Sequence, residues 1–266
     1  MLPEILAVLR CPVCGTAFGT PFVCEGGHSF DRAKQGYVNL LAGKDPGTGD
    51  TADMVARRAA FLARGYYAPI AAALPAVDGL VLDAGAGTGY YLADVLDRSP
   101  GAHGLALDLS KFAVRRAAKA HPRMAAAVAD CWAGLPVADE SFDAVLNVFA
   151  PRNAAEFSRV LKLGGTLTVV TPLPEHLAGL REPLGMLGVQ PAKSERTDGV
   201  LEKHFLLETE TVVRATMDLD RAAAADLAGM GPSAWHTDPE ARAAALPEQV
   251  SVDLALRVAV YGRTPG

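Results

Sequence analysis

The feature that most constrains the fold is a glycine-rich turn between an expected strand and an expected helix. Leu80–Asp83 has the composition of a short buried strand, Ala84–Gly89 places glycine at every second position, and Tyr90–Leu96 has the composition of a helix. Glycine lets the backbone of such a turn approach a ligand closely, and the amide groups of the helix N-terminus face that ligand. The pattern predicts an α/β fold in which strands and helices alternate.

Acidic residues after three of the expected strands indicate the kind of ligand. Asp108 ends the strand that starts at Gly104, about 20 residues after the glycines, where an acid can accept both ribose hydroxyls of an adenosine. Nicotinamide enzymes share this acid. Asp83 favours S-adenosylmethionine, because a carboxylate directly before the turn can hold its ammonium group but would repel a pyrophosphate. Asp130, after a third strand, suits the adenine amino group.

The elements that follow are typical of class I methyltransferases. Ser141–Leu146 leads a fourth strand, Ala154–Leu161 forms a helix, and Lys162–Leu167 carries two glycines into a fifth strand. We expect a Rossmann-like parallel sheet with helices on both faces. A nicotinamide enzyme and a non-catalytic relative of the methyltransferases are the alternatives.

The C-terminal third predicts antiparallel strands that close the sheet. Strand-like alternation covers Leu201–Met217, a helix is expected near Arg221–Leu227, and Val252–Tyr261 forms the last strand. Pro172–Pro191 is rich enough in glycine and proline to form a lid over the cofactor. In the N-terminal half, Pro69 is expected to divide the apolar helical pattern of Met54–Ala73 into two helices.

Four potential metal ligands lie close together near the N-terminus: Cys11, Cys14, Cys24 and His28. A Cys-x-x-Cys pair and a Cys-x-x-x-His pair can close the tetrahedral shell of one Zn²⁺ ion. A redox-active pair is the competing interpretation, but turn residues surround this one instead of a strand–helix pattern. Because a closed shell leaves no position for water, we expect the zinc to be structural.

Composition and charge exclude several other classes. No stretch approaches the roughly 18 apolar residues that a membrane-spanning helix needs, and the N-terminus lacks a signal-peptide pattern. We therefore expect a cytoplasmic protein without a membrane partner. A net charge of −5 argues against coating nucleic acid, and no DNA partner is expected. It leaves open an RNA enzyme with a local basic patch.

The chain resembles the bacterial 23S ribosomal RNA guanine-N1 methyltransferases, a group that includes tylosin-resistance enzymes, over nearly its whole length. The four expected metal ligands match that family in type and order, and the segment from Phe30 to Leu41 is highly specific for it. The other matching segments are Gly49–Thr51 with Met54, Arg58 and Phe61, Gly87–Tyr91, Asp108–Lys111, Ala150–Pro151 and Met230–Trp235. Position 147 is Asn where a relative has Arg, so Asn147 is given no catalytic role.

The resemblance implies an activity and further cofactor contacts. It implies transfer of a methyl group to N1 of a guanine in a hairpin loop of 23S rRNA, which contributes to macrolide resistance of the tylosin type. It adds Tyr67, Thr88, Gly89 and His176 to the cofactor site. The expected cofactor-binding set is then Tyr67, Asp83, Gly85, Gly87, Thr88, Gly89, Asp108, Asp130 and His176.

The chemistry sets requirements for the RNA side of the site. The guanine N1 must lose its proton and must be unpaired, either in a loop or flipped out of a stack. A flat apolar side chain is needed to hold the base, and Phe149, Pro151 and Trp235 are the candidates, with burial in the core as the alternative for each. No general base is assigned.

Two groups of cations are candidates for holding RNA. One lies near the metal motif, where RNA contact is favoured: Arg32, Lys34, Arg57, Arg58 and Arg64. The other is expected to be a solvated helix face, with RNA contact as its alternative: Lys111, Arg115, Arg116, Lys119 and Arg123.

These observations predict three regions. Residues 1–42 form a zinc-binding RNA-recognition module, residues 43–68 a linker and helix, and residues 69–266 the methyltransferase domain. One rival is a zinc-ribbon RNA-binding protein with an inactive methyltransferase-like domain, and another is a small-molecule methyltransferase. The intact acids and glycines speak against the first, and the metal motif and arginine groups against the second. The sequence leaves a homodimer open.

Overall fold

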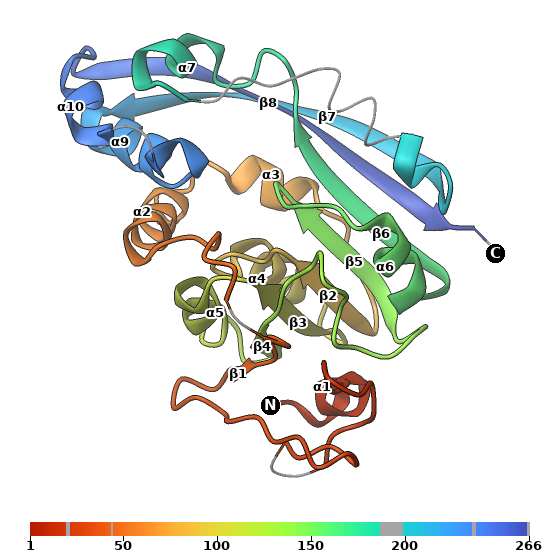
Figure 1. Cartoon of the computed structure of the whole chain (residues 1–266). Coiled ribbons are helices and arrows are strands. Elements are labelled where there is room, and N and C mark those ends of the chain that lie inside the picture. The colour runs from red at the N-terminus through yellow and green to blue at the C-terminus, as the bar shows by residue number, and fades with distance from the viewer. Residues whose placement is uncertain (20–21, 44, 187–198, 236–237, 265–266) are drawn as a thin grey trace.

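One mixed sheet organises the molecule. The computed structural model describes residues 1–19, 22–43, 45–186, 199–235 and 238–264 (Figure 1). Within these residues the sheet has eight strands in the order β1-β4-β3-β2-β5-β6-β8-β7. The strands are β1 (Val38–Asn39), β2 (Leu80–Ala84), β3 (His103–Asp108), β4 (Met124–Val128), β5 (Phe142–Val148), β6 (Leu161–Pro172), β7 (Phe205–Asp220) and β8 (Gln249–Arg263).

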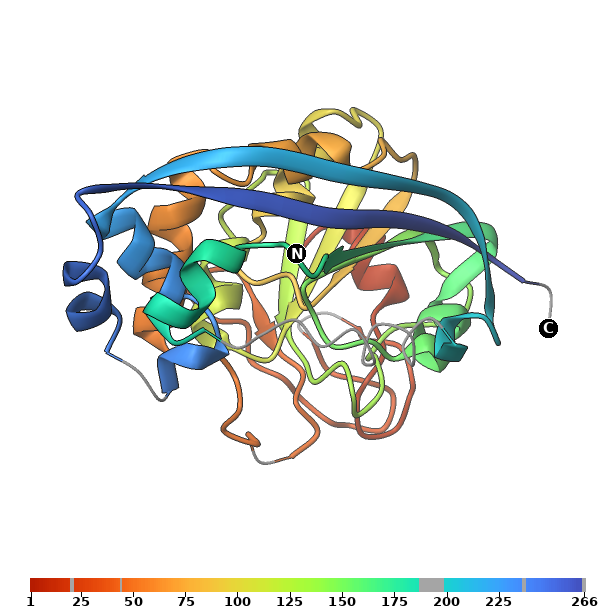
Figure 2. The same ribbon diagram turned by 90° about the horizontal axis from the view of Figure 1, so that it is seen from above.

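The direction of the strands confirms the expected class of fold. Neighbouring strands from β1 to β6 pair in parallel, and β8 pairs antiparallel with both β6 and β7. Parallel strands end at the same edge of a sheet, so the turns after β2, β3, β4 and β5 lie together. The long β7–β8 pair runs across the molecule (Figure 2). β4, the third strand expected from the sequence, ends at Val128, so Asp130 lies in the turn beyond it.

Helices cover the sheet. They are α1 (Pro3–Val8), α2 (Ala52–Ala63), α3 (Ala68–Ala73), α4 (Tyr90–Asp97), α5 (Lys111–Ala117), α6 (Ala154–Val160), α7 (Ala178–Leu184), α9 (Arg221–Gly229), the 3₁₀ helix η1 (Pro232–Trp235) and α10 (Pro239–Ala244). Some of them lie where the sequence placed them (α2, α3, α4, α5, α6 and α9) and others where it expected none (α1, α7, η1 and α10). Pro69 lies in the first turn of α3, so the expected division of the helical pattern is confirmed. The last part of the expected lid, residues 187–191, lies outside the described residues.

Alternate residues of the strands build two hydrophobic cores, one on each face of the sheet. Val81 of β2 belongs to the core that also contains buried residues of α3, α4 and α9. Leu82, its neighbour in the strand, belongs to the core on the other face, which also contains Phe157 of α6 and Ile5 and Leu9 of the N-terminal segment. The N-terminal segment therefore contributes to the second core of the sheet.

Backbone hydrogen bonds attach the N-terminal segment to the sheet domain. The Ala138 amide donates to Val8 O at 2.8 Å, and the Arg10 amide donates to Pro136 O at 2.8 Å. β1 lies inside the predicted module of residues 1–42, yet it pairs with β4 as the edge strand of the large sheet. The division at residue 42 stays a prediction.

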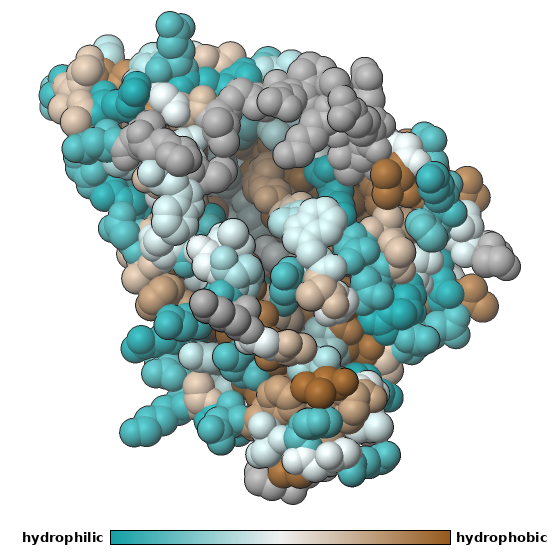
Figure 3. All heavy atoms as spheres, in the orientation of Figure 1, coloured by the Kyte–Doolittle hydropathy of each residue, from teal (hydrophilic) through white to brown (hydrophobic). Residues whose placement is uncertain are grey.

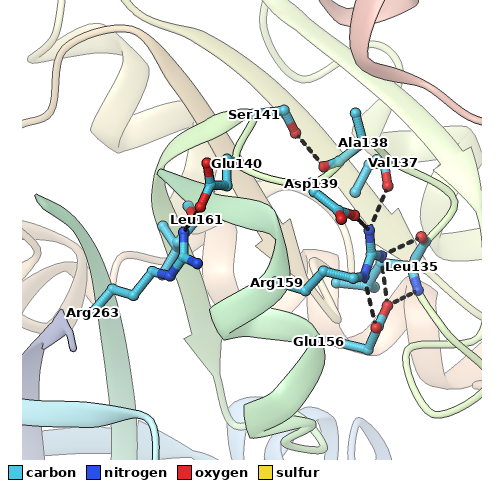
Figure 4. Close-up of polar contacts among 10 residues, drawn as sticks. All are labelled: Leu135, Val137, Ala138, Asp139, Glu140, Ser141, Glu156, Arg159, Leu161 and Arg263. Atoms are coloured by element: carbon cyan, nitrogen blue, oxygen red, sulfur yellow. Dashed lines mark hydrogen bonds and ion pairs between the residues drawn. The ribbon is translucent and has the colours of Figure 1, made fainter. Parts of the chain in front are cut away.

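Arg159 of α6 fixes the loop that receives this segment (Figure 4). Its guanidinium donates to Val137 O and Leu135 O, each at 2.9 Å, and pairs with Asp139 and Glu156, each at 2.7 Å. Glu156 also accepts from the Leu135 amide at 2.6 Å. One side chain thus holds both ends of the 135–139 segment.

No helix among the described residues is long and apolar enough to cross a membrane.

Candidate cofactor site and metal centre

The glycine turn between β2 and α4 lies so close to neighbouring segments that it has no room for a larger residue at two positions. Gly85 has φ +85°, and a Cβ there would lie 2.4 Å from Ala150 Cβ of the loop after β5. Gly89 has φ +79° at the N-cap of α4, where a Cβ would lie 3.1 Å from Ala117 Cα. Both positions need glycine for conformation and for space.

Asp83, at the end of β2, is a buried carboxyl group without a protein partner. It is 1% exposed, and neither carboxylate oxygen accepts a hydrogen bond from a described residue. Burial, and then the nearby Asp108 charge, raise the pKa of Asp83 to about 8. An unpaired buried charge is costly, so the group holds a proton or awaits a cationic ligand.

Asp108 lies beside the glycine turn, as predicted for the second acid. One carboxylate oxygen accepts from the Gly87 amide and the other from the Ser110 amide, both at 2.8 Å. Burial raises the pKa of Asp108, while these two amides lower it. Each oxygen keeps a further lone pair with which it can accept a hydroxyl.

Aromatic side chains from four separate segments meet near these acids. The ring centroid of Phe149 lies 6.1 Å from Tyr67, 6.4 Å from Tyr91 and 6.4 Å from His176, whose ring is tilted only 16° from that of Phe149. Tyr67, Tyr91 and His176 are buried, whereas Phe149 is 42% exposed. The structure thus brings two predicted cofactor residues, Tyr67 and His176, next to a predicted substrate residue.

Two details of this aromatic cluster bear on its chemistry. Phe149 has φ +55°, a conformation that is strained for a bulky residue and that is concentrated at functional sites. Burial lowers the pKa of His176 to about 4, so the imidazole is neutral at physiological pH. Its Nδ1 accepts from the Ala255 amide at 3.3 Å, which leaves the proton on Nε2.

Other predicted residues make no ring contact with this cluster in the described part of the chain. Asp130 faces a cleft of about 690 Å³ between the N-terminal segment and the 129–139 loop, and it accepts from the Trp132 amide at 2.9 Å. Trp235 is 51% exposed in η1, and it makes no ring contact with the cluster among the described residues. Pro151 is exposed in the loop after β5.

Arg58 of α2 lies against the glycine turn but has protein partners. Its guanidinium pairs with Asp50 of the linker and donates to Met230 O at 2.6 Å. A Cβ at Gly87 would lie 3.4 Å from its Nη1. Thr88 lies in the same turn, between the two glycines. Arg58 therefore joins α2, the linker and the segment before η1 at the site.

The four predicted metal ligands come together. Their ligand atoms lie within 4.8 Å of one another, with Cys14 Sγ 3.5 Å from Cys24 Sγ and Cys24 Sγ 3.3 Å from His28 Nδ1. Ligands bound about 2.0–2.3 Å from one tetrahedral ion lie roughly 3.3–3.8 Å apart, so this set fits Zn²⁺. The closed Cys₃His set gives the ion a structural role.

Three residues that the sequence analysis left without a role also belong to the site. Asn147 is fully buried, and its Nδ2 donates to Ala84 O at 3.2 Å and to Pro151 O at 2.9 Å. It therefore ties the loop after β5 to the glycine turn. Cys131 is buried beside the acids, and Trp132 is 64% exposed next to Asp130. The feature of the sequence that could have pointed to Asn147 is a polar residue within an otherwise apolar strand.

The fold, the glycine turn and the acids at the ends of β2 and β3 define a class I S-adenosylmethionine-dependent methyltransferase. A family model described as "Methyltransferase domain" matches residues 81–165, and one described as "RlmA, N-terminal", a zinc ribbon, matches residues 9–44. The chain carries one structural zinc site and uses S-adenosylmethionine.

The chain belongs to the 23S rRNA (guanine-N1)-methyltransferase family. It is 50% identical to a protein of Micromonospora griseorubida that bears this family's name, over 98% of this chain and 99% of the relative. It is 45% identical to the 23S rRNA (guanine-748-N1)-methyltransferase of Streptomyces fradiae over the whole of both chains. It is 31% identical to YxjB of Bacillus subtilis over 95% of each chain.

A solved structure agrees on the fold. A Haloferax volcanii methyltransferase, solved with its methyltransferase activator, aligns with a TM-score of 0.52 and 21% identity over 80% of this chain and 95% of that one. At this identity the match supports the fold alone. The predicted family and fold class are confirmed.

Proposed function

We propose that this protein transfers the methyl group of S-adenosylmethionine to N1 of a guanine in a hairpin loop of 23S rRNA. The observation that carries the proposal is the 45% identity to the Streptomyces fradiae enzyme over both whole chains. The inactive and small-molecule alternatives are not favoured, because the glycine turn, its acids and the metal set are all present in one chain. We further propose a cytoplasmic location; the homodimer stays a prediction.

The pocket offers a complementary group for each part of the cofactor, whose sulfonium supplies the methyl group. Asp83 faces the ammonium group, and Asp108 accepts the ribose hydroxyls. The glycine turn with Thr88 lets the backbone approach, and Asp130 accepts the adenine amino group. Tyr67 and His176 form a wall. The unpartnered oxygens of Asp83 support this assignment, since no described residue satisfies them.

The RNA side of the pocket is assigned to the loop after β5. Phe149 is the exposed member of the aromatic cluster, so its face is available to stack on an extruded guanine. Its strained backbone is held by Asn147 through Pro151 O. Holding the base in line with the methyl group supplies most of the acceleration in such a transfer. Arg58, Pro151 and Trp235 stay predicted RNA contacts.

The product can be detected directly. N1 methylation blocks base pairing, so reverse transcription of 23S rRNA should stop at one new guanine when the gene is expressed in a tylosin-sensitive bacterium that lacks the modification. The stop should vanish in the Asp83→Ala variant. A folded, cofactor-bound protein that produces no stop would contradict the proposal.

We also propose that the methyl group contributes to resistance to tylosin-type macrolides. It removes a donor and adds bulk at the base edge, so a drug group that packs against that edge loses complementarity. A raised inhibitory concentration of tylosin is the expected result. Because resistance can depend on a second modification, the new stop, and not drug sensitivity, decides the enzymatic activity.

Removing the Asp108 carboxylate should weaken cofactor binding. Hydrogen bonds to a charged group contribute about 1.5–3 kcal/mol each, so the dissociation constant of S-adenosylmethionine should rise at least about tenfold in Asp108→Ala. Asp108→Asn, which keeps one acceptor oxygen, should lie between that variant and the wild type. Asp78→Ala, an exposed acid two residues before β2, is the control. Calorimetry measures all three, and an unchanged constant in Asp108→Ala would show that the ribose lies elsewhere.

A further inference from the structure

Most arginines that the sequence offered as RNA contacts are bonded within the protein. Arg57 pairs with Asp53 and Glu240, and Arg64 pairs with Asp220 at 3.0 Å. Arg123 donates to Ser99 O and Ala102 O, each at 2.6 Å, and Arg58 is held by Asp50 and Met230 O. These side chains support the packing of α2, α4 and α9, so cations for a polyanionic substrate must be sought elsewhere.

The cations of α5 and of the turn after it differ from these arginines in their surroundings. Lys111, Arg115 and Lys119 recur at four-residue spacing, which places them on one side of the helical path, and all three are exposed. None of them forms an ion pair with an acid in the described part of the chain, and the sequence between Ser110 and Ala129 contains no acid. Like charges at this spacing repel one another, so the stripe is unfavourable until an anion neutralises it.

An exposed aromatic ring lies within the same stripe. Phe112 is 37% exposed, and Lys111 Nζ lies 5.3 Å from the centroid of its ring. Cations that follow a phosphate backbone, combined with aromatic rings on which bases stack, are the usual means of binding single-stranded nucleic acid. A solvated helix face has no need of the exposed ring.

The stripe begins at the edge of the cofactor site. α5 starts at Lys111, three residues after Asp108, and its N-cap Ser110 donates to Asp50 O at 2.6 Å. α5 also packs on β4, the neighbour of β1 in the N-terminal segment. On the left of the molecule, where α5 and the segment before β1 lie, hydrophilic side chains are mixed with apolar ones (Figure 3). An RNA strand lying on α5 would therefore reach the cofactor.

We propose that Lys111, Phe112, Arg115 and Lys119 form a surface, here named the α5 surface, that binds the RNA substrate beside the target guanine. The three cations contact phosphates, and Phe112 stacks on an unpaired base. The inference rests on the proposed function. Because the whole chain carries a net charge of −5, attraction to a polyanion must come from such a local group.

The test compares two variants with the same change in charge. The α5 variant carries Lys111→Ala, Arg115→Ala and Lys119→Ala. The control carries Lys162→Ala, Lys203→Ala and Arg214→Ala, three exposed cations at the other end of the sheet. Binding of a 23S rRNA hairpin is measured between 50 and 200 mM salt, together with methyl transfer to it.

The α5 variant should bind the hairpin at least about tenfold more weakly at low salt. Its salt slope should fall by about 2, since each phosphate contact contributes roughly 0.7 to the slope for a single strand. The KM for RNA should rise with little change in kcat, and cofactor affinity should not change. Phe112→Leu should weaken binding at least about fivefold and leave the salt slope unchanged, because stacking releases no counterions.

The possible outcomes distinguish a failure of the α5 surface from a failure of the proposed function. Equal losses in the α5 variant and the control, or no loss in either, would overturn the α5 surface while wild-type methylation still supports the proposed function. A wild-type protein that neither binds nor methylates the hairpin would overturn both. A weaker cofactor affinity in the α5 variant would show that it damages the pocket and would also count against the surface.

Discussion

The Cys14→Ser variant should lose its zinc ion and unfold at a temperature on the order of 10 °C lower than the wild type. Cys14 is the exposed member of the metal set, so the substitution removes a ligand without removing a packed side chain. With three protein ligands the coordination of zinc is incomplete. The small N-terminal fold is then destabilised, because its stability comes largely from the bound ion.

The loss should spread beyond the metal because the N-terminal segment belongs to the second core. Ile5 and Leu9 are fully buried on the sheet. Burying such a side chain stabilises a protein by about 1.5–3 kcal/mol, and 1 kcal/mol shifts the unfolding midpoint of a chain of this size by roughly 2–4 °C. Cofactor affinity should change little, because α4 and the tyrosines beside Asp83 pack in the other core.

Zinc content, calorimetric unfolding and rRNA methylation together check this prediction. Methylation should fall at least tenfold if the module helps to hold RNA. Cys131→Ser is the control for replacing a cysteine by serine, since Cys131 is buried in the second core and lies outside the metal set. That variant should keep one zinc ion. Full rRNA methylation by metal-free protein would refute the proposed role of the module.

Local patterns were enough to predict the centre of the fold. The strand, glycine turn and helix over residues 80–97 follow from short-range preferences, and so does the break at Pro69. The metal set was equally accessible, because ligand spacing in a short segment fixes its geometry. These features depend on residues that are close in the chain.

Long-range partners could not be predicted in this way. Arg57 and Glu240 pair across 183 positions, and no periodicity in the sequence joins them. The two-residue strand β1 is too short to show alternation, so its place at the edge of the sheet was missed. The structural role of Asn147 was missed because its two carbonyl partners become neighbours only when the sheet forms.

The affinity for S-adenosylmethionine should rise as the pH increases from about 6 to about 8. In the protein without ligand, burial and then Asp108 raise the pKa of Asp83 to about 8, so this carboxyl group holds a proton at neutral pH. Only the ionised carboxylate can pair with an ammonium group. If Asp83 holds the cofactor ammonium, as proposed, binding must release that proton, and affinity is lost as the pH falls below about 8, by up to about tenfold per pH unit.

The raised pKa of Asp83 also makes the stability of the folded protein depend on pH. Between its ordinary pKa and about 8, the folded protein without ligand binds a proton that the unfolded chain releases. The unfolding midpoint should therefore fall as the pH rises through this range, while the cofactor-bound protein should depend less on pH. Above about pH 8 the α-amino group of the cofactor begins to lose its own proton, so affinity should pass through a maximum near that pH.

Asp83→Asn should remove most of this dependence, because an amide does not titrate. Affinity at pH 8 should be at least about tenfold weaker, since hydrogen bonds to a charged group contribute about 1.5–3 kcal/mol. Any remaining slope would come from Asp108, whose pKa burial also raises. Calorimetry at pH 7 in two buffers of different ionisation enthalpy counts the protons released on binding. Wild-type protein that releases none and binds equally well at pH 6 and pH 8 would place the ammonium group away from Asp83, and the buried carboxyl would then need another partner.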